Sequence, residues 1–442
     1  MTAPRRSRPH LVLPLLVLAA MAGCGKQVAG PDGQYGPNPS LPEPNEYLLP
    51  PMKTATSKPW TQAEMPTAGP GLRVQPFATG LIHPRSVLAL PNGDVLVAQS
   101  DGPKPPVNRP KDLVMGLIQA HAKSFGPKAP NNIMLLRDTN GDGIADQRFV
   151  FLEGRHSPFG MAIVGNDLYV ADTDALIRYH YTPGQTRMTD PGTKVTDLPG
   201  GPINHHWTKS LVASPDGSKL YVGVGSNSNI TENGMAAENE RAAIWEVDAR
   251  TGAHRLYATG TRNPVGITFE PTTHVLWAVV NERDELGPNL VPDYLTSIRD
   301  GGFYGWPYSY WGQHVDPRVK PQRPDLVARA IKPDYGLSSH VAPLGVAFST
   351  GPALPAQYRG GAFVGEHGSW DRDPFNGYKV VYIAFVNGRP TGKPIDALSG
   401  FLTDGNTAHG RPVGLATDNQ GAILVADDLG NAVWRLSARV GP

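Results

Sequence analysis

The chain has 442 residues, with 40 basic and 39 acidic side chains and a formal net charge of +1. This near-neutral balance gives no electrostatic reason to expect a nucleic-acid partner, and none is predicted. The 50 glycines and 45 prolines are too many for a helical protein and favour many short strands joined by tight turns.

Residues 1–24 have the pattern of an export signal. A basic start precedes an apolar run from Leu11 to Ala20, which is too short to cross a bilayer, and small residues then lead to Cys24. The last four letters, Met-Ala-Gly-Cys, resemble a bacterial lipobox, in which the cysteine is lipidated after cleavage. We expect an exported lipoprotein anchored to a membrane through Cys24 and facing the periplasm or the cell exterior; a plain secretory signal is the alternative. Without another cysteine, the mature domain forms no disulfide.

Residues 25–70 contain many prolines among short polar residues, so no periodic apolar face can form there. We interpret this stretch as a semi-extended tether or a wrap on the domain surface. The folded domain is predicted to cover residues 71–442. Within it, Lys111–Gly126 has apolar residues at helical spacing and predicts a short inserted amphipathic helix.

One pattern recurs along the domain: an apolar strand, a turn with Asn-Gly, Asp-Gly or a similar pair, and a second apolar strand. Such units are typical of β-hairpins. The six copies begin at Pro84, Pro158, Thr208, Asn263, Pro343 and Pro412. Six hairpins at intervals of tens of residues predict an all-β, six-bladed β-propeller in which each blade buries its faces against its neighbours.

The first candidate site residue is His206, in Asn204–Trp207 before the third copy. A histidine near its ordinary pKa can act as a general base at physiological pH. The alternative is a pair of histidines, His205 and His206, hydrogen-bonded to loop carbonyls. Before the fourth copy, Arg262 and Asn263 offer a cation and a neutral donor for a carboxylate, a quinone oxygen or a developing alkoxide. A capped turn is the alternative there.

Two further segments follow the fourth copy. Residues 281–288 contain carboxylates, including Glu282, and loop carbonyls, which are hard oxygen donors suited to Ca²⁺. Residues 301–307 form a Gly-rich aromatic turn containing Trp306, which could supply a flat wall against a planar cofactor. Solvated loop charges are the default interpretation of such acidic segments.

Basic residues gather near the last two copies, namely Arg372, Lys379 and Arg411. If they converge, they would bind a small polyanion; singly, each is a surface charge. The segment 138–146 contains Asp138, Asn140 and Asp142 at calcium-loop spacing but is too short for an EF-hand. It predicts either a peripheral structural Ca²⁺ site or an Asx-rich turn.

Taken in order, these signals resemble the pyrroloquinoline-quinone (PQQ) dependent dehydrogenases of the glucose/sorbosone family. The most specific match is TGTRNPVGITFEP at 259–271, followed at family-like distance by GGFYGWP at 301–307. HHWTKSLVASPDG at 205–217 resembles the segment with the family's catalytic histidine, which places that residue at His206.

The resemblance implies a cofactor pair of PQQ and Ca²⁺. His206 is then the base that takes the sugar C1 hydroxyl proton, and Arg262 and Asn263 stabilise negative charge on the quinone oxygens. Main-chain oxygens of Gly287 and Pro288 help to hold the Ca²⁺, which acts as a Lewis acid.

The same resemblance assigns the cofactor carboxylates to Arg372, Lys379 and Arg411. Three features depart from the family pattern. His205 replaces an acidic residue, His156 replaces a glutamine in the loop of the second copy, where it would face the cofactor, and the Ca²⁺ loop that contains Gly287 and Pro288 is longer.

The sequence therefore predicts a PQQ-dependent oxidoreductase acting on an aldose or on a sugar aldehyde such as sorbosone, with electrons passed to a separate acceptor. Two alternatives remain open. One is a non-catalytic lipoprotein propeller that binds a sugar, a cell-wall fragment or a protein; the other is a Ca²⁺-dependent hydrolase of the lactonase type. A hydrolase needs no basic cluster, and a binding protein needs no histidine beside a quinone.

Overall fold

The structure, a computed structural model, describes residues 31–45, 53–61, 63–104, 127–370 and 372–439. In this part of the chain strands dominate, which confirms the nearly all-β prediction. The helices there are short: η1 (Pro31–Gln34), η2 (Met235–Glu238), α2 (Pro324–Val327) and η3 (Ala356–Tyr358). The predicted signal over 1–24 and the predicted helix over Lys111–Gly126 lie outside the described residues.

Each of the first three hairpins opens an antiparallel sheet in which strands follow in chain order. The first sheet contains β5 (Pro84–Ala89), β6 (Val95–Gln99), β7 (Asn132–Arg137) and β8 (Gln147–Leu152). The second contains β9 (Gly160–Val164), β10 (Asp167–Ala171), β11 (Ala175–His180) and β12 (Thr193–Asp197). The third contains β13 (Lys209–Ala213), β14 (Lys219–Val224), β15 (Ala243–Asp248) and β16 (His254–Thr259), with β20 (Gly302–Phe303) added in parallel.

The other three hairpins do the same. The fourth sheet contains β17 (Asn263–Phe269), β18 (Leu276–Asn281), β19 (Pro292–Ser297) and β23 (Tyr335–Ser339). The fifth contains β24 (Pro343–Phe348), β25 (Ala362–Glu366), β26 (Lys379–Val386) and β27 (Arg389–Ser399). The sixth contains β30 (Pro412–Thr417), β31 (Ile423–Asp427), β32 (Ala432–Ala438) and, as its last strand, β4 (Leu72–Thr79).

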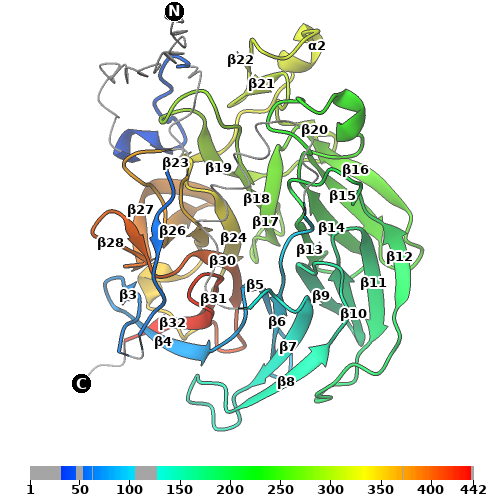
Figure 1. Ribbon diagram of the computed structural model, residues 1–442, viewed down its shortest axis with the longest axis vertical. Coiled ribbons are helices and arrows are strands. Elements are labelled where there is room, and N and C mark those ends of the chain that lie inside the picture. Colours follow the sequence, from blue (N-terminus) through cyan, green and yellow to red (C-terminus); the bar gives the residue numbers. More distant parts are fainter. Residues whose placement is uncertain (1–30, 46–52, 62, 105–126, 371, 440–442) are drawn as a thin grey trace, which may run out of the picture.

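The sixth sheet joins the two ends of the domain. Strand β4, at the start of the domain, pairs along its whole length with β32, near the C-terminus, and Figure 1 shows the two side by side. A sheet that combines both ends of the chain closes the architecture without leaving either end as an unpaired edge.

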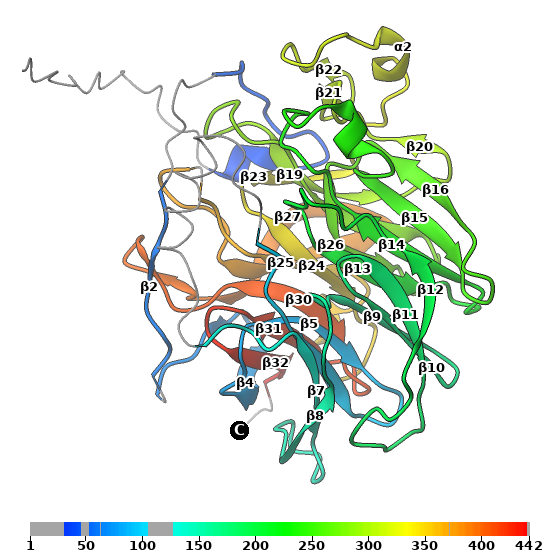
Figure 2. The same ribbon diagram turned by 45° about the vertical axis from the view of Figure 1, so that its right-hand side comes forward.

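The first strands of the sheets form a ring. They contact one another in the order β5, β9, β13, β17, β24, β30, and β30 contacts β5. Glycines permit this close approach, because a Cβ atom at Gly160 would lie 2.5 Å from the Lys209 carbonyl oxygen and one at Gly345 would lie 2.2 Å from that of Val413. The later strands of each sheet extend outward, as Figure 2 shows for β13 to β16.

The apolar core lies between neighbouring sheets. One cluster, for example, combines Leu96 and Leu135 of the first sheet with Leu168 and Val170 of the second. Such face-to-face packing buries the faces that the alternating strand pattern makes apolar. No helix among the described residues is both long and apolar enough to cross a bilayer.

The described parts of the Pro-rich segment lie against these sheets. β1 (Tyr35–Gly36) pairs with β23, and β3 (Thr67–Ala68) pairs with β27. β2 (Thr56–Ser57) joins β28 (Leu402–Thr403) and β29 (Thr407–Ala408) in a small sheet. A second small sheet, β21 (Ser309–Tyr310) with β22 (His314–Val315), lies near α2 in a protrusion beyond the large sheets (Figures 1 and 2).

Candidate active site

The hairpin registers bring the predicted site segments to one face of the ring. In each hairpin the first residue of the first strand pairs with the end of the second strand, as in Asn263 with Asn281 and Pro412 with Asp427. The residues before the first strands and after the second strands therefore gather at the same end. We call this end the loop face; it contains the segments 204–207, 225–229, 282–284 and 340–342.

His206 lies on the loop face with one ring nitrogen anchored. Its Nδ1 is 2.7 Å from the carbonyl oxygen of Ser226 and 3.1 Å from the hydroxyl of the same residue. A carbonyl oxygen only accepts hydrogen bonds, so Nδ1 carries the proton and Nε2 retains its lone pair. Burial, together with the positive charge of Arg262, lowers the pKa of His206 to about 3. The ring is therefore a neutral base at physiological pH.

Gly225 brings His206 and Asn263 side by side. A Cβ atom at Gly225 would lie 2.3 Å from the Asn263 side-chain oxygen and 2.5 Å from the His206 Cβ. No side chain fits in that space, so only glycine allows both neighbours their positions. Asn263 is buried, and its side-chain oxygen has no hydrogen-bond partner among the described residues. The pair His206 and Asn263 thus offers a base and an unsatisfied amide at one place.

The Arg262 guanidinium is buried and already well hydrogen-bonded. Its Nη1 donates to the Glu282 carbonyl at 2.6 Å, and its Nη2 donates to the Asn229 side-chain oxygen at 3.0 Å and to the Asp284 carboxylate at 3.3 Å. Its Nε donates to the Asn229 carbonyl at 3.3 Å, and Nη1 also donates to the Asn281 carbonyl at 3.4 Å, so all five N–H donors are engaged. These contacts favour a role as a fixed positive charge beside His206. Donation to a quinone oxygen stays a prediction, and it would require one of these bonds to open.

Asp284 joins Arg262 to His340. One carboxylate oxygen lies 3.3 Å from the Arg262 Nη2 and the other lies 3.3 Å from the His340 Nδ1. Burial raises the pKa of Asp284, but the His340 hydrogen bond and the Arg262 charge outweigh it and lower the pKa to about 2. Asp284 is therefore ionised and balances the buried Arg262.

The predicted calcium oxygens are engaged by side-chain donors. The Gly287 carbonyl lies 3.0 Å from the His340 Nε2, and the Pro288 carbonyl accepts from the Arg372 Nη1 at 2.6 Å. Burial raises the pKa of nearby Glu282 to about 7. A Ca²⁺ ion on these two carbonyls would have to displace a guanidinium and an imidazole, so the arrangement as it stands does not fit the ion. The calcium requirement stays a prediction.

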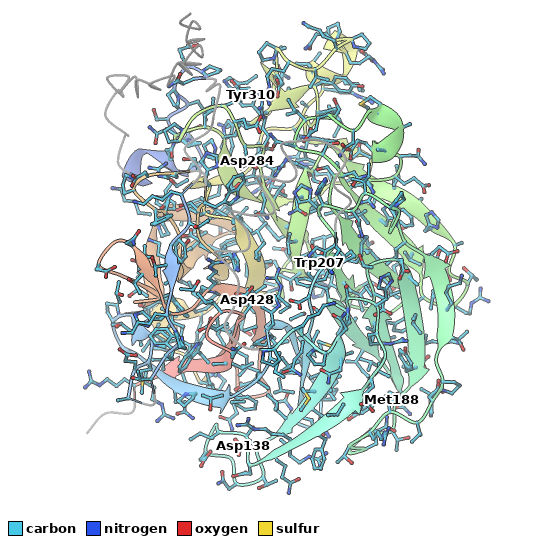
Figure 3. The ribbon with its side chains drawn as sticks, viewed as in Figure 1. Asp138, Met188, Trp207, Asp284, Tyr310 and Asp428 are labelled. Carbon is cyan, nitrogen blue, oxygen red and sulfur yellow. The ribbon has the colours of Figure 1, made fainter. Side chains whose placement is uncertain are left out.

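A second charged group lies on the loop face between the first and last sheets. The Asp428 carboxylate accepts from Arg85 Nη1, lies 3.0 Å from the His367 Nε2 and 3.5 Å from the His83 Nε2. Although burial raises its pKa, His367 and Arg85 hold the pKa of Asp428 far below its ordinary value. The Arg85 guanidinium also lies over the Trp207 ring, 5.8 Å from its centroid. Trp207 links this group to His206, and Figure 3 places Trp207 and Asp428 in the middle of the molecule.

Arg411 stands beside this group. Its guanidinium lies 6.0 Å from the Tyr378 ring centroid and forms no ion pair with the residues that the structure describes. The Nε atoms of both Arg411 and Arg85 are buried and have no hydrogen-bond partner among the described residues. Two guanidiniums with unmet donors suit an anionic ligand, since charge-assisted bonds to carboxylates would satisfy them.

An apolar floor lies beneath these groups. Phe159, Val265 and Val413 form a buried cluster at the starts of three first strands, and Trp207 and Leu344 pack against it. A floor of this kind excludes water below the site, which strengthens the electrostatic interactions above it.

The other predicted cofactor residues have partners elsewhere. Lys379 is the first residue of β26, the third strand of its sheet. Its ammonium lies 2.7 Å from the carboxylate of Asp396, on the neighbouring strand β27. His156 is exposed, with its Nδ1 2.8 Å from the Asp174 carboxylate. Their contacts with a cofactor remain predictions that this geometry does not favour.

Trp306 and Arg372 are buried supports. The Trp306 indole N–H donates to the Asn229 carbonyl at 2.9 Å, so the ring holds the loop that also binds Arg262. Arg372 donates to the Ser339 hydroxyl at 2.7 Å in addition to the Pro288 carbonyl. Only 4% of the Trp306 surface is exposed, which leaves little ring area for a flat cofactor.

The predicted peripheral calcium loop is a set of Asx turns in this structure. Asp138 accepts from the backbone N–H groups of Gly141 and Gly143 at 2.7 and 2.8 Å, and Asn140 accepts from that of Asp142 at 2.9 Å. Figure 3 places Asp138 at the edge of the molecule, away from Trp207 and Asp284. No group of three or more His, Cys, Asp or Glu side chains that could hold a metal occurs in the described ranges.

The sequence interpretation missed four residues that shape this face: Ser226, Asn229, Arg85 and Asp428. Two of them had a usable signal. Arg85 follows the proline that starts the first copy, and Asp428 follows the second strand of the last copy, so the hairpin register alone places both on the loop face. Ser226 and Asn229 lie in a loop without a recognisable motif.

Comparison with known protein families shows to which family the chain belongs. The TrAA12-like family matches residues 132–292 and 321–439, more than half of the chain. The chain belongs to the TrAA12-like family. The family match includes the segments with His206, Arg262, Asn263 and Arg411.

Individual relatives share between a quarter and a third of their residues with this chain over the aligned regions. The chain is 30% identical over 241 residues to an uncharacterized protein of Borreliella burgdorferi, covering 54% of this chain and 62% of that protein. It is 25% identical over 433 residues to a pyrroloquinoline quinone-dependent pyranose dehydrogenase of Coprinopsis cinerea, covering 84% of this chain and 54% of that protein. The chain thus spans less than two thirds of the length of these two relatives.

Solved structures share the fold. The calcium structure of a Trichoderma reesei carbohydrate-active enzyme of family AA12 has a TM-score of 0.68 and 21% identity, over 85% of this chain and 97% of that one. The holo form of the PQQ domain of the Coprinopsis cinerea pyranose dehydrogenase also has a TM-score of 0.68, with 20% identity, over 87% of this chain and 99% of that one.

Proposed function

We propose that the protein is a PQQ-dependent oxidoreductase that oxidises an aldose or a sugar aldehyde, with His206 as the general base. The observation that carries this proposal is the anchoring of the His206 Nδ1 on the Ser226 carbonyl at 2.7 Å, which presents a neutral Nε2 on the loop face. Two relatives of this chain are described as PQQ-dependent pyranose and sugar dehydrogenases, from Coprinopsis cinerea and Hypocrea jecorina. We further propose that each of the six sheets is one propeller blade.

The residues present fit an anionic planar cofactor such as PQQ, a tricarboxylate. Arg85 and Arg411, with their buried and unmet Nε donors, would hold carboxylates, and the Asn263 amide would face the quinone edge. Asp428 competes for Arg85, so Arg411 is the cation that the described residues leave available. When bound, PQQ supplies an acceptor for the two electrons of the substrate.

His206 removes the proton in this scheme. Its Nε2 would accept the proton of the sugar C1 hydroxyl while the C1 hydrogen leaves as a hydride, for which bound PQQ would be the acceptor. The cyclic hemiacetal is thereby oxidised to the lactone, so C1 goes from the aldehyde to the carboxylic-acid oxidation level. Nδ1–H stays on the Ser226 carbonyl and keeps the ring oriented. The imidazolium formed here lies beside the ionised Asp284, which contributes a favourable charge to His206. No step requires Ca²⁺ at Gly287 and Pro288.

The electron acceptor and the cellular location of the protein are proposals that rest on the sequence. A separate acceptor would take the electrons from the reduced cofactor. The predicted lipid anchor at Cys24 lies outside the described residues, and we propose that it holds the domain on the outer side of a membrane.

The test is reconstitution of the purified full-length chain with PQQ, with and without Ca²⁺, followed by dye reduction across a panel of aldoses and sorbosone. Sugar-dependent reduction that requires PQQ is the expected result, and the panel identifies the substrate class. A protein that binds a sugar but no PQQ would instead be a binding lipoprotein. Hydrolysis of a lactone without PQQ would establish a hydrolase and refute the oxidoreductase.

A further inference from the structure

Residues 31–45 of the Pro-rich segment, which we call the strap, insert a polar side chain into the interior. Gln34, at the end of η1, is only 1% exposed. Burying an amide is unfavourable unless its donors and acceptors are satisfied. The strap lies outside the residues that match the family, 132–292 and 321–439.

Gln34 satisfies its amide on a loop and a strand that lie far away in the sequence. Its Nε2 donates to the Asn289 carbonyl, and its Oε1 accepts from the Ser338 hydroxyl at 3.1 Å and from the Ser339 hydroxyl at 2.9 Å. The backbone N–H of Ser339 also donates to the same Oε1, at 3.3 Å. One amide therefore connects the loop at 286–289 to the end of β23.

The backbone beside Gln34 is closely fitted to β23. Tyr35 pairs with Leu337 and Gly36 with Gly336. A Cβ atom at Gly336 would lie 2.7 Å from the Gln34 carbonyl oxygen, so glycine is required for the strap to approach. This fit fixes where the Gln34 side chain enters.

The other end of the strap holds the same loop. The backbone N–H of Asn45 donates to the Leu286 carbonyl at 3.0 Å. Gln34 contacts Asn289 at the far end of that loop. The four residues 286–289 are thus held at both ends by the strap.

The residues held in this way belong to the candidate site. Between the two fixed ends lie the carbonyls of Gly287 and Pro288, which contact His340 and Arg372. The Ser339 hydroxyl, beside Gln34, is 2.9 Å from the Pro288 carbonyl and accepts from Arg372 Nη1 at 2.7 Å. Gln34 therefore lies one side chain away from Arg372.

We propose that Gln34 is a positioning residue of the candidate active site: by fixing the 286–289 loop and Ser339, it holds Arg372 and His340 in place. Through His340 it supports the Asp284–Arg262 pair beside His206, and so the binding of an anionic cofactor. The ligand in this statement rests on the proposed function, whereas the fixing of the loop does not. Gln34 touches neither substrate nor cofactor and acts through Ser339 and the loop.

The test compares the full chain with Gln34→Met, which keeps the side-chain length but removes all four hydrogen bonds. The matched control is Asn38→Ala, which removes an exposed strap contact, the 2.6 Å bond from the Lys332 ammonium to Asn38. Hydrogen–deuterium exchange without cofactor reports on the amides of Leu290 and Ser339, and titration with PQQ gives its Kd.

We expect exchange at Leu290 and Ser339 to be about five-fold faster in Gln34→Met, the loss of about one buried hydrogen bond. The Kd for PQQ should rise about ten-fold, as for other residues that support a binding group. Exchange in the 138–146 turn should not change, and Asn38→Ala should behave as wild type. Unchanged exchange at the two amides, or faster exchange with an unchanged Kd, would overturn the inference.

Two further outcomes are separable. If wild type binds no PQQ, the proposed function fails, and the exchange data alone then decide whether Gln34 fixes the loop. If Gln34→Met does not fold, Asn45→Pro replaces it, because this change removes the N–H that donates to the Leu286 carbonyl at a residue whose side chain is exposed. Faster exchange at Leu290 in Asn45→Pro would support the strap's role, and wild-type exchange there would refute it.

Discussion

The Nδ1 atom of His206 lies 2.7 Å from the carbonyl oxygen of Ser226, and this contact decides which ring nitrogen can act as a base. A carbonyl cannot donate, so the proton of the neutral ring is confined to Nδ1. The loop at 225–229 that supplies the carbonyl also binds Arg262 through Asn229. The base and the positive charge are thus held by one segment.

Gly225→Ala should damage activity far more than stability. The added Cβ would meet Asn263 at 2.3 Å and His206 at 2.5 Å, so both side chains must shift. We expect kcat/KM for sugar oxidation to fall about 100-fold, because displacements near 1 Å at reacting groups have effects of this size. Steady-state kinetics of the PQQ-loaded protein give the answer.

The control is Gly201→Ala, where a Cβ would meet no atom within 4 Å. It should retain wild-type kinetics. If Gly225→Ala also retains them, His206 and Asn263 do not share the site.

Arg411→Met should weaken PQQ binding without unfolding the protein. The guanidinium forms no ion pair among the described residues, so its removal leaves no partner there uncompensated. Loss of one charge-assisted hydrogen bond, about 1.5–3 kcal/mol, corresponds to a Kd roughly 10- to 100-fold higher. Fluorescence titration with PQQ measures it, with Arg250→Met, at an exposed turn, as the control. An unchanged Kd would remove Arg411 from the cofactor site.

Glu366→Gln should change how stability depends on pH. Glu366 is fully buried, its carboxyl oxygens have no hydrogen-bond partner in the described part of the chain, and burial raises its pKa from 4.5 to about 8. Between these two values the folded protein retains a proton that the unfolded chain releases. Stability from this group is therefore complete at acid pH and is lost as pH rises toward the folded pKa.

The measurement is Tm at pH 5 and pH 8.5 for wild type and variant. Glutamine is neutral in both states, so Glu366→Gln should lose less Tm than wild type across this interval. Glu43→Gln, at an exposed position of the strap, should follow wild type. Parallel losses in wild type and Glu366→Gln would mean that Glu366 is ionised when folded.

Asp316→Asn should be strongly destabilising. Asp316 and Arg283 form a 2.5 Å ion pair in which both side chains are 1% exposed. Removing one charge leaves the other buried and unpaired, which costs about 3–5 kcal/mol. Denaturant unfolding should show this loss, whereas Asp197→Asn, in an exposed pair with Lys194, should leave the transition unchanged. Equal effects of the two changes would contradict the burial of Arg283.

The hairpins were predictable because their signals are local. Val95–Gln99 and Ile423–Asp427 are apolar strands that follow Asn-Gly and Gln-Gly turns, and both occur as the pattern predicts. The outer strands have no such signal. The strand Thr193–Asp197 is mostly exposed, and its sequence is that of an ordinary polar segment with no strand pattern. Pairing decides its structure, and pairing cannot be read from the segment itself.

The site was predictable where a motif marks it, as at His206, or where the hairpin register places a residue on the loop face, as for Arg85 and Asp428. The motifs implied that His206, Arg262 and Asn263 lie together, but they gave no physical reason for it. In the structure, Gly225 packs between His206 and Asn263 and lets them approach. The contacts that set charge and position join distant segments: Arg85 to Asp428 spans 343 residues and Gln34 to Ser339 spans 305. Lys379 shows the same dependence on pairing, since Asp396, a carboxylate on the neighbouring strand, pairs with a cation whose partner the sequence does not reveal.

The most direct test of the central claim is the rate of sugar-dependent dye reduction by the PQQ-loaded protein, for wild type and His206→Asn, between pH 5 and pH 8. Because the pKa of His206 is lowered to about 3, the base stays unprotonated over this range, and the wild-type rate should not fall with a midpoint near the ordinary histidine value of 6.5. His206→Asn should bind PQQ as wild type does but react about 10²- to 10⁴-fold more slowly at every pH. A variant as fast as wild type, or a wild-type rate that falls through pH 6.5, would contradict the account.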